Sequence, residues 1–250
     1  MNRIAILRLV VIVGFVAAVE LLCRTGAISP MTMIAPSAML VAMIHIVSSG
    51  EADADLLFTL TNIAAAITLA VVAGFILGAV IHALPRLRRV VDPYLAAYYA
   101  VPTFVFYPLL IVVFGLNRLP LIVIGAMFGI IGMTVSTIDG IDRIPRVLLK
   151  TAHGYRMDPV KTALLIKLPA AAPHLFTGLK LAVTYSVIGI VAGEFILSIA
   201  GLGRRISLAY NDLDNTRMYG LLLLLLAITS LINIALQLVE QRLYRRWGTT

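Results

Sequence analysis

The sequence predicts an all-α integral membrane protein in which six helices cross the bilayer and both termini lie in the cytoplasm. Its composition supports this class, because 61% of the 250 residues are hydrophobic and the mean hydropathy is +1.01. Only 13% of the residues are charged, whereas about a quarter are charged in an ordinary soluble domain. The third observation is a series of six apolar runs of membrane-crossing length. We expect them to form one domain over residues 1–250.

Each of the six apolar runs reaches the roughly 20 residues that a helix needs to cross the hydrocarbon layer. The fourth run carries Pro120 where a helix would begin, which suits the first helical turn. A shorter run, 37–49, cannot cross, and Pro36 and Gly50 mark its start and its end. We expect it to lie on the outer face as an interfacial helix. The predicted spans are 4–22, 57–81, 94–114, 120–138, 181–199 and 218–239.

The distribution of lysine and arginine gives the predicted orientation, because these residues are enriched in cytoplasmic loops. With both termini inside, fifteen of the 20 basic residues fall on the cytoplasmic side. Residues 1–55 then hold the first span and the periplasmic helix, 56–240 hold the core spans, and 139–173 form a cytoplasmic loop. The basic residues that fall outside are Arg24, Arg118, Arg204, Arg205 and Arg217.

Small residues four positions apart occur in three of the predicted spans. Such pairs let a neighbouring backbone approach closely and are typical of helix packing inside membranes. We therefore expect close helix contacts at Gly74 and Gly78, Gly125 and Gly129, and Gly189 and Gly193.

Several classes of function are excluded by the same composition. The net charge of +8 does not indicate nucleic-acid binding, because the basic residues lie in short segments between apolar runs. The single Cys23 excludes a disulfide framework or a cysteine-rich metal site. The sequence contains no glycine-rich phosphate loop and no helical zinc motif. We expect no catalytic residue, metal site or cofactor in this chain.

Residues 144–169 form a basic stretch between two apolar runs, and their pattern predicts a helical hairpin. Pro145 can open a first helix, and Gly154 can close it in a left-handed conformation. Asp158 and Pro159 are typical of the N-cap and first position of a second helix, which we expect to end at Leu168. A cationic hairpin with apolar residues every four positions can bind a groove on a soluble partner. The alternative is a solvated loop whose charges only set the topology.

The segment 150–169 resembles the EAA loop of binding-protein-dependent ABC transporter permeases. Ala152, Ile166, Leu168 and Pro169 match that pattern. The family usually has Glu at position 150, Ala at 151 and Gly at 156, where this chain has Lys, Thr and Arg. We expect Gly154 to take over as the hinge. The resemblance implies that the following residues couple the chain to an ATPase: Arg146, Lys150, Ala152, Gly154, Arg156, Asp158, Pro159, Lys161, Leu164, Ile166, Leu168 and Pro169.

Two further segments narrow the resemblance. Residues 91–102 with Pro108 and 114–116, and residues 193–203, look like parts of permeases for nitrate, sulfonate, taurine and related solutes. The resemblance implies a type I importer in a bacterial inner membrane. It would contain two copies of this permease, two cytoplasmic ATP-binding subunits that bind ATP and Mg²⁺, and a periplasmic substrate-binding protein. Membrane lipid is the remaining partner.

Candidate residues for a gate or substrate pathway lie in the third and fifth spans. An acid inside a span is costly, so Glu194 should face protein or a water-filled cavity. Glu194 could be a gate, or it could pair with Arg204, Arg205 or a backbone donor near Gly201. The aromatic residues of the third span could instead pack between helices, and residues 201–203 could be a flexible outer turn. The pathway candidates are Tyr98, Pro102, Thr103, Tyr107, Tyr185, Glu194, Gly201 and Gly203.

The resulting functional hypothesis is a permease subunit that imports a small organic anion, such as a sulfonate, taurine or nitrate, by alternating access. A separate ATPase would drive it, so the chain itself would not be an enzyme. Three alternatives stay open: a stand-alone secondary carrier or channel, an importer of a neutral heterocycle such as a pyrimidine vitamin precursor, and a membrane-embedded enzyme. The enzyme would need paired carboxylates or a similar constellation, which the sequence does not contain.

Overall fold

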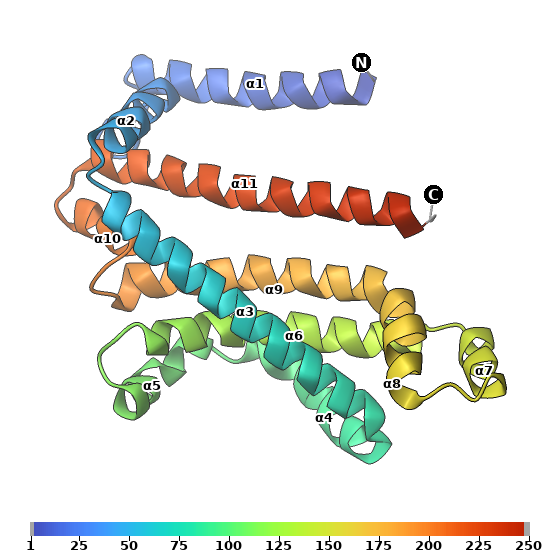
Figure 1. Ribbon diagram of the computed structural model, residues 1–250. Helices are drawn as coiled ribbons and strands as arrows, with labels where there is room; N and C mark the ends of the chain where they lie inside the picture. The colour runs from blue at the N-terminus through green and yellow to red at the C-terminus, as the bar shows by residue number, and fades with distance from the viewer. Residues whose placement is uncertain (1–2, 248–250) are drawn as a thin grey trace. The chain divides into compact units, whose positions relative to one another are not determined.

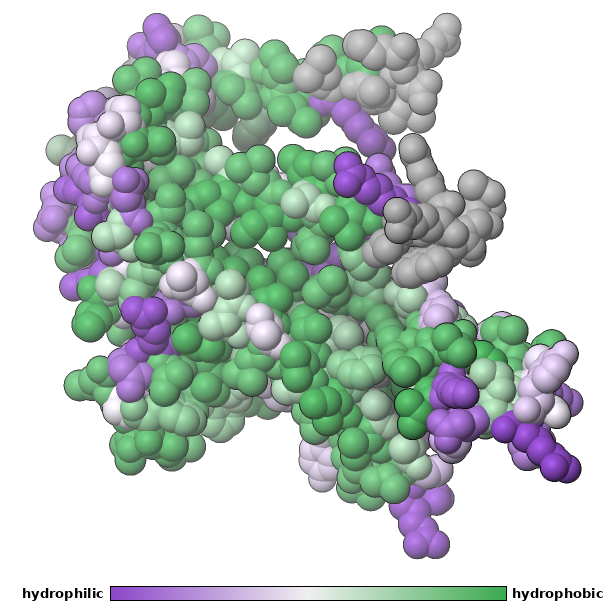
Figure 2. All heavy atoms as spheres, in the orientation of Figure 1, coloured by the Kyte–Doolittle hydropathy of each residue, from purple (hydrophilic) through white to green (hydrophobic). Residues whose placement is uncertain are grey.

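The computed structural model describes residues 3–247, and every regular element in that range is a helix (Figure 1). Residues 1–2 and 248–250, which belong to the termini predicted to be cytoplasmic, lie outside the described range. The surface drawn in Figure 2 is mainly hydrophobic, and hydrophilic side chains gather near the ends of helices. The all-α membrane fold is confirmed. Five helical segments are long and apolar enough to cross a membrane: Ile6–Arg24, Asp53–Ala83, Leu119–Asp142, Pro159–Leu197 and Asn215–Arg242.

The third predicted span is not one continuous helix. Pro102 lacks a backbone N–H, and the preceding Val101 is extended (φ −81°, ψ 122°), as the residue before a proline prefers. The backbone therefore leaves the helix between two 3-10 turns. Five spans are thus found, and the six-span count stays a prediction. The elements of this region are α4 (Pro85–Ala97), η1 (Tyr98–Ala100), η2 (Thr103–Phe106) and α5 (Tyr107–Phe114).

The helices form two compact units. The first contains the residues up to Thr59 together with Glu194–Leu231, and the second contains Leu60–Gly193 together with the residues from Ile232 onward. Three long helices contribute to both units: α3 (Asp53–Ala83), α9 (Leu168–Leu197) and α11 (Asn215–Trp247).

The first unit is built around α2 (Pro36–Ser49), α10 (Leu202–Asn211) and the start of α11. Gly50 ends α2 in the left-handed conformation (φ 68°), as its position in the sequence predicts. Close packing of α2 on α11 is possible because Gly220 has no side chain, and a Cβ there would lie 2.9 Å from that of Ala42. None of the residues of α1 (Arg3–Arg24) whose exposure the structure describes is buried. The buried core consists of Ile46, Ala52, Leu202, Ile206, Leu221 and Leu224.

The second unit is built around α6 (Leu119–Asp142), which packs against α3 and α9. A Cβ at Gly74 would lie 2.7 Å from the carbonyl oxygen of Ile130, and one at Gly129 would lie 2.7 Å from that of Ala182. The helices could not approach this closely with larger side chains. The prediction that the glycine pairs mark close helix contacts is confirmed. A buried cluster, Ala70, Ala126, Met133 and Ala182, fills the space between these helices.

Candidate functional site

The predicted hairpin begins with α7 (Arg146–Gly154), and the helix ends in a Schellman motif. Met157 N–H donates to the Ala152 carbonyl (3.0 Å), and Arg156 N–H donates to the His153 carbonyl (3.0 Å). The left-handed residue of the motif is Arg156, with φ 50°, whereas Gly154 is still helical. The prediction that Gly154 provides the left-handed cap is therefore wrong. The end of the helix extends two residues further than predicted. The left-handed residue therefore lies at position 156, where the resembling family usually has glycine.

The second half of the hairpin begins as predicted. The Asp158 carboxylate accepts hydrogen bonds from the Val160 N–H (3.0 Å) and the Lys161 N–H (3.4 Å), and Pro159 occupies the first turn of α8 (Pro159–Thr162). The predicted end of this helix at Leu168 is wrong. A π-helical turn, η3 (Ala163–Lys167), joins α8 to α9, and Leu168 N–H donates to the Ala163 carbonyl. This wider turn accommodates Pro169, which has no N–H, inside a continuous helical run.

The hairpin exposes apolar side chains among cations. Val160 is 64% exposed and Leu164 is 58% exposed, while Ala152 on α7 is buried. The four basic residues of this surface are exposed, and no ion pair among the described residues involves them. An exposed apolar ridge with unpaired cations is typical of a surface that binds another protein. We call it the hairpin surface; it consists of Arg146, Val147, Lys150, Tyr155, Val160, Lys161, Leu164, Leu165 and Lys167.

A group of charged residues holds the end of α6 just before the hairpin. The Asp142 carboxylate lies 2.6 Å from the Arg88 guanidinium and 3.2 Å from His82 Nε2. The hydrogen bond to Asp142 raises the pKa of Arg88 above its ordinary value. No pattern in the sequence points to this group, because Arg88 lies 54 positions from Asp142 along the chain. It connects α3 and α4 to α6 at the base of the hairpin.

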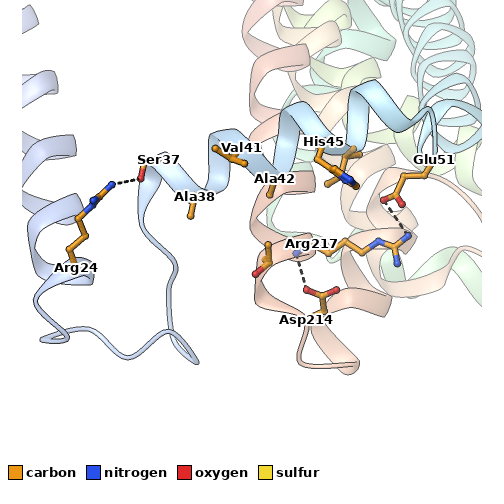
Figure 3. A pocket seen from close by; sticks show the side chains of 11 residues that line it. Arg24, Ser37, Ala38, Val41, Ala42, His45, Glu51, Asp214 and Arg217 are labelled. Carbon is orange, nitrogen blue, oxygen red and sulfur yellow. Dashed lines mark hydrogen bonds and ion pairs between the residues drawn. The ribbon is translucent and has the colours of Figure 1, made fainter.

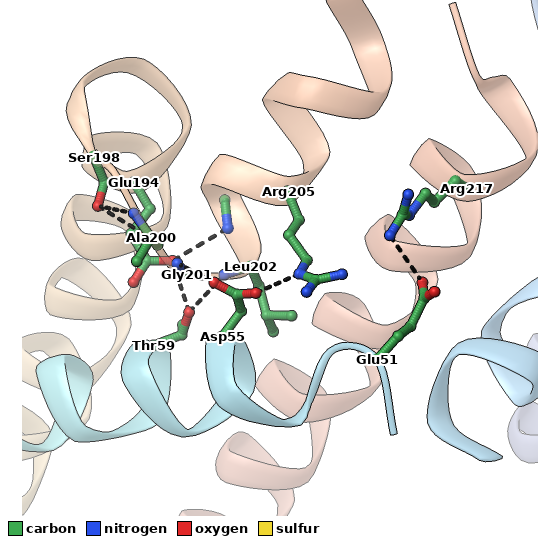
Figure 4. Close-up of polar contacts among 11 residues, drawn as sticks. Glu51, Asp55, Thr59, Glu194, Ser198, Ala200, Gly201, Leu202, Arg205 and Arg217 are labelled. Carbon is green, nitrogen blue, oxygen red and sulfur yellow. Dashed lines mark hydrogen bonds and ion pairs between the residues drawn. The ribbon is translucent and has the colours of Figure 1, made fainter. Parts of the chain in front are cut away.

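A second polar cluster surrounds the first turn of α10 (Figure 4). The Gly201 N–H donates to Asp55 (2.8 Å), the Leu202 N–H to Thr59 Oγ1 (2.9 Å) and the Gly203 N–H to Glu194 Oε2 (3.1 Å). The Thr59 hydroxyl also donates to Glu194 Oε2 (2.7 Å). Side chains from α3 and α9 thus satisfy the free amides at the start of α10. We call Asp55, Thr59 and Glu194 the α10 cap.

Glu194 is completely buried in this cap. Arg205 forms its ion pair with Asp55, and of the predicted partners of Glu194 the backbone donor near Gly201 is found, at Gly203. Gly201 is needed because its φ is 105° and a Cβ there would collide with the Glu194 carboxylate. Sequence reasoning missed Asp55 and Thr59, since nothing in a single sequence links them to residues about 140 positions away.

The remaining pathway candidates lie in the second unit. Tyr98 is half-buried and donates a hydrogen bond to the Met127 carbonyl (3.1 Å), and Thr103 is buried. The Phe104 ring packs on Phe128 at a centroid distance of 5.3 Å. Pro102 is exposed, and Tyr107 and Tyr185 are half-buried. Glu194, Gly201 and Gly203 belong to the first unit, so the candidates are divided between the two units.

The first unit also contains a large recess of about 820 Å³ beside α2 (Figure 3). Arg24 lies at one end and donates to Ser37 (3.2 Å). At the other end Arg217 pairs with Glu51 (3.3 Å), and the Arg217 N–H donates to Asp214 (3.0 Å). The recess presents charges of both signs. It lies on the side of the membrane that the distribution of lysine and arginine predicts to be external.

Comparison with known proteins decides the class. The sequence model of the family described as "Binding-protein-dependent transport system inner membrane component" matches residues 70–249. The chain belongs to this family. It is 26% identical over 223 residues to the taurine transport system permease protein of Escherichia coli, covering 86% of this chain and 80% of the relative.

A riboflavin transport system permease protein of Chloroflexus aurantiacus is 30% identical over 161 residues, which cover 64% of this chain and 60% of that protein. The match therefore spans about three fifths of the length of that relative. The solved structure of an inward-facing methionine ABC transporter superposes with a TM-score of 0.62 at 20% identity, covering 74% of this chain and 92% of that one. The likeness shows the fold, and the predicted resemblance to ABC importer permeases is confirmed. The chain is a multi-pass inner-membrane protein.

Proposed function

We propose that this chain is the membrane-spanning subunit of an ATP-driven importer and that its hairpin surface binds a separate ATP-binding subunit. The exposed apolar ridge at Val160 and Leu164, flanked by cations without ion pairs, supports the proposal most directly. Burying such a ridge in a groove of a partner removes apolar surface from water, while the cations give the contact its orientation. ATP and Mg²⁺ belong to the partner, and this chain carries out no chemistry of its own.

The structure suggests how force would travel from the ATPase. The helical run Pro159–Leu197 is continuous through the π-helical turn, so its first residues lie on the hairpin surface and its last turns carry Glu194. A pull on the hairpin would therefore act directly on this continuous helix. The Asp142 contacts with Arg88 and His82 would pass the same motion to α3 and α4. Closure and opening of the ATPase pair would thus drive alternating access.

The assembly that fits this role is a homodimer of the permease with two ATP-binding subunits and one periplasmic substrate-binding protein. Family membership implies ATP-binding and substrate-binding partners and dimeric assembly in general. The recess beside α2, with charges of both signs, is a suitable contact for the substrate-binding protein. Membrane lipid would surround the apolar helices, including the exposed α1.

For the solute we propose a small organic anion, such as a sulfonate like taurine, or nitrate. The relative named for taurine transport favours this class, whereas two of the three external arginines, Arg205 and Arg217, are already paired with Asp55 and Glu51. The relative named for riboflavin transport favours the second candidate, a neutral heterocycle. Calorimetry of the purified substrate-binding protein with taurine, nitrate and a pyrimidine would distinguish the two classes.

The decisive experiment tests the hairpin surface. We expect the combined variant Arg146→Glu, Lys161→Glu and Lys167→Glu to lose co-purification with the ATP-binding subunit, because the charges now repel the partner that they formerly oriented. A matched control is Arg86→Glu with Arg89→Glu, which reverses two exposed cations on α4 and should leave the complex intact. Full assembly of the hairpin variant would contradict the proposal. Solute transport by this chain alone in liposomes, driven by an ion gradient, would instead favour a secondary carrier.

A further inference from the structure

One face of α3 is a stripe of small residues in the second unit. Positions 66, 70, 74 and 78 are Ala, Ala, Gly and Gly, which repeat every four residues and so share one side of the helix. Ala66 lies against Gly125, where a Cβ would come within 3.1 Å of it, and Ala70 lies within 3.0 Å of a Cβ at Gly129. A Cβ at Gly78 would likewise lie very close to atoms of Thr134 and Thr137 on α6. This stripe forms a tightly packed seam between α3 and α6.

Asn62 is the next position of the same stripe toward the start of α3. Its side chain is 1% exposed, and within the described part of the chain neither Nδ2 nor Oδ1 has a hydrogen-bond partner. The Thr134 and Thr137 hydroxyls of the seam donate to carbonyls of their own helix at 2.8 Å and 2.7 Å, whereas the buried Ser186 hydroxyl of α9, beside Gly129, also has no partner among the described residues. An asparagine amide cannot be left unpaired inside a membrane protein without a substantial cost.

The register of the seam indicates what surrounds this amide. Ala66 is level with Gly125 and Ala70 with Gly129, so Asn62 is level with Leu121, one turn earlier on α6. Leu121 in turn lies against Gly193 of α9. Asn62 is 1% exposed within one chain, so neither lipid nor a second copy can reach its amide while the seam is closed.

We propose that Asn62 is a positioning residue that makes the closed seam unstable enough to open, and that its amide finds hydrogen-bond partners only when α3 separates from α6 at this end. The inference rests on the proposed ATP-driven function. Small residues allow the seam to close and part without side chains having to interdigitate. The unpaired amide lowers the stability of the closed arrangement, so the two arrangements differ little in free energy and ATP binding can shift the population.

The first test removes the amide while keeping a branched side chain. We expect Asn62→Leu to raise the Tm of the purified permease–ATPase complex and to lower vanadate-sensitive ATP hydrolysis about tenfold, because the closed seam no longer contains an unpaired polar group. Thr137→Val, at the other end of the seam, removes a hydroxyl that is already satisfied and should change hydrolysis less than about twofold. Unchanged hydrolysis in Asn62→Leu, or a lower Tm, would overturn the proposal.

The second test does not depend on tolerance of leucine. Leu121→Cys in a Cys23→Ser chain keeps Asn62 and places one buried thiol at its level in the seam, and N-ethylmaleimide reports its accessibility. We expect labelling to differ at least about fivefold between the nucleotide-free and the vanadate-trapped complex, since only the opened seam admits the reagent. Equal labelling in both states of a complex that hydrolyses ATP would overturn the inference and leave the proposed function intact. A chain that binds no ATPase would overturn the proposed function itself.

Discussion

The hairpin surface and the α10 cap show two different ways in which this sequence builds polar structure at the end of an apolar helix. In the hairpin the contacts are local. The Asp158 side chain accepts hydrogen bonds from amides two and three residues later, and the Schellman motif of α7 joins residues five positions apart. In the α10 cap, Thr59 and Asp55 reach amides more than 140 positions away. Local contacts leave side chains exposed for a partner, whereas long-range contacts bury theirs.

This difference suggests that the two regions have different tasks. The hairpin can change its partner contacts without loss of the fold, because its stability depends on its own caps. The α10 cap ties α3 and α9 to one helix terminus through a buried carboxylate, so its loss should disturb the whole first unit. Substitutions in the two regions should therefore separate assembly from stability.

The largest effect is expected at the α10 cap. We expect Glu194→Ala to lower the free energy of unfolding by about 3 kcal/mol, since the Thr59 hydroxyl and the Gly203 N–H would both lose their acceptor in a buried place. Glu194→Gln keeps a carbonyl acceptor and should lose less than half as much. Thermal unfolding of the detergent-solubilised protein measures both. If Glu194 were mainly a gate, Glu194→Gln would impair transport at an unchanged Tm.

The features that the sequence predicts, and those that it does not, follow the same division between local and long-range contacts. Hydropathy predicts five of the spans. Short-range signals predict the helix starts and ends at Pro120, Gly50, Asp158 and Pro159, because each signal acts within one or two helical turns. The length of the third apolar run predicts one continuous helix, and the break arises because Pro102 has no N–H and Val101 before it is extended. Of the α10 cap, the sequence predicts only the contact of Glu194 with a backbone donor near Gly201, and it predicts neither the contacts of Asp55 and Thr59 nor the Asp142 group. Their partners come together only when helices pack.

A smaller effect is expected from the N-cap of the hairpin. We expect Asp158→Ala to cost about 1 kcal/mol of stability, because the Val160 and Lys161 amides lose their acceptor. The substitution should loosen α8 and weaken binding of the ATP-binding subunit more than it lowers the Tm. Asp158→Asn retains a capping oxygen and serves as the control. A wild-type affinity for the ATP-binding subunit in Asp158→Ala would show that the second helix is held by its partner rather than by its own cap.

The smallest effect locates the bend between the two halves of the hairpin. Gly154 is helical, and a Cβ there would meet nothing within 4 Å, so Gly154→Ala should stabilise the protein by about 0.5–1 kcal/mol. Arg156 holds the left-handed position, so Arg156→Gly should be neutral or slightly stabilising, whereas Arg156→Val should destabilise by about 1 kcal/mol or more. Thermal unfolding of the three variants compares them directly. A loss of stability in Gly154→Ala would place the bend at Gly154, two residues earlier than the backbone has it, and would restore the role that the sequence pattern first predicts for that glycine.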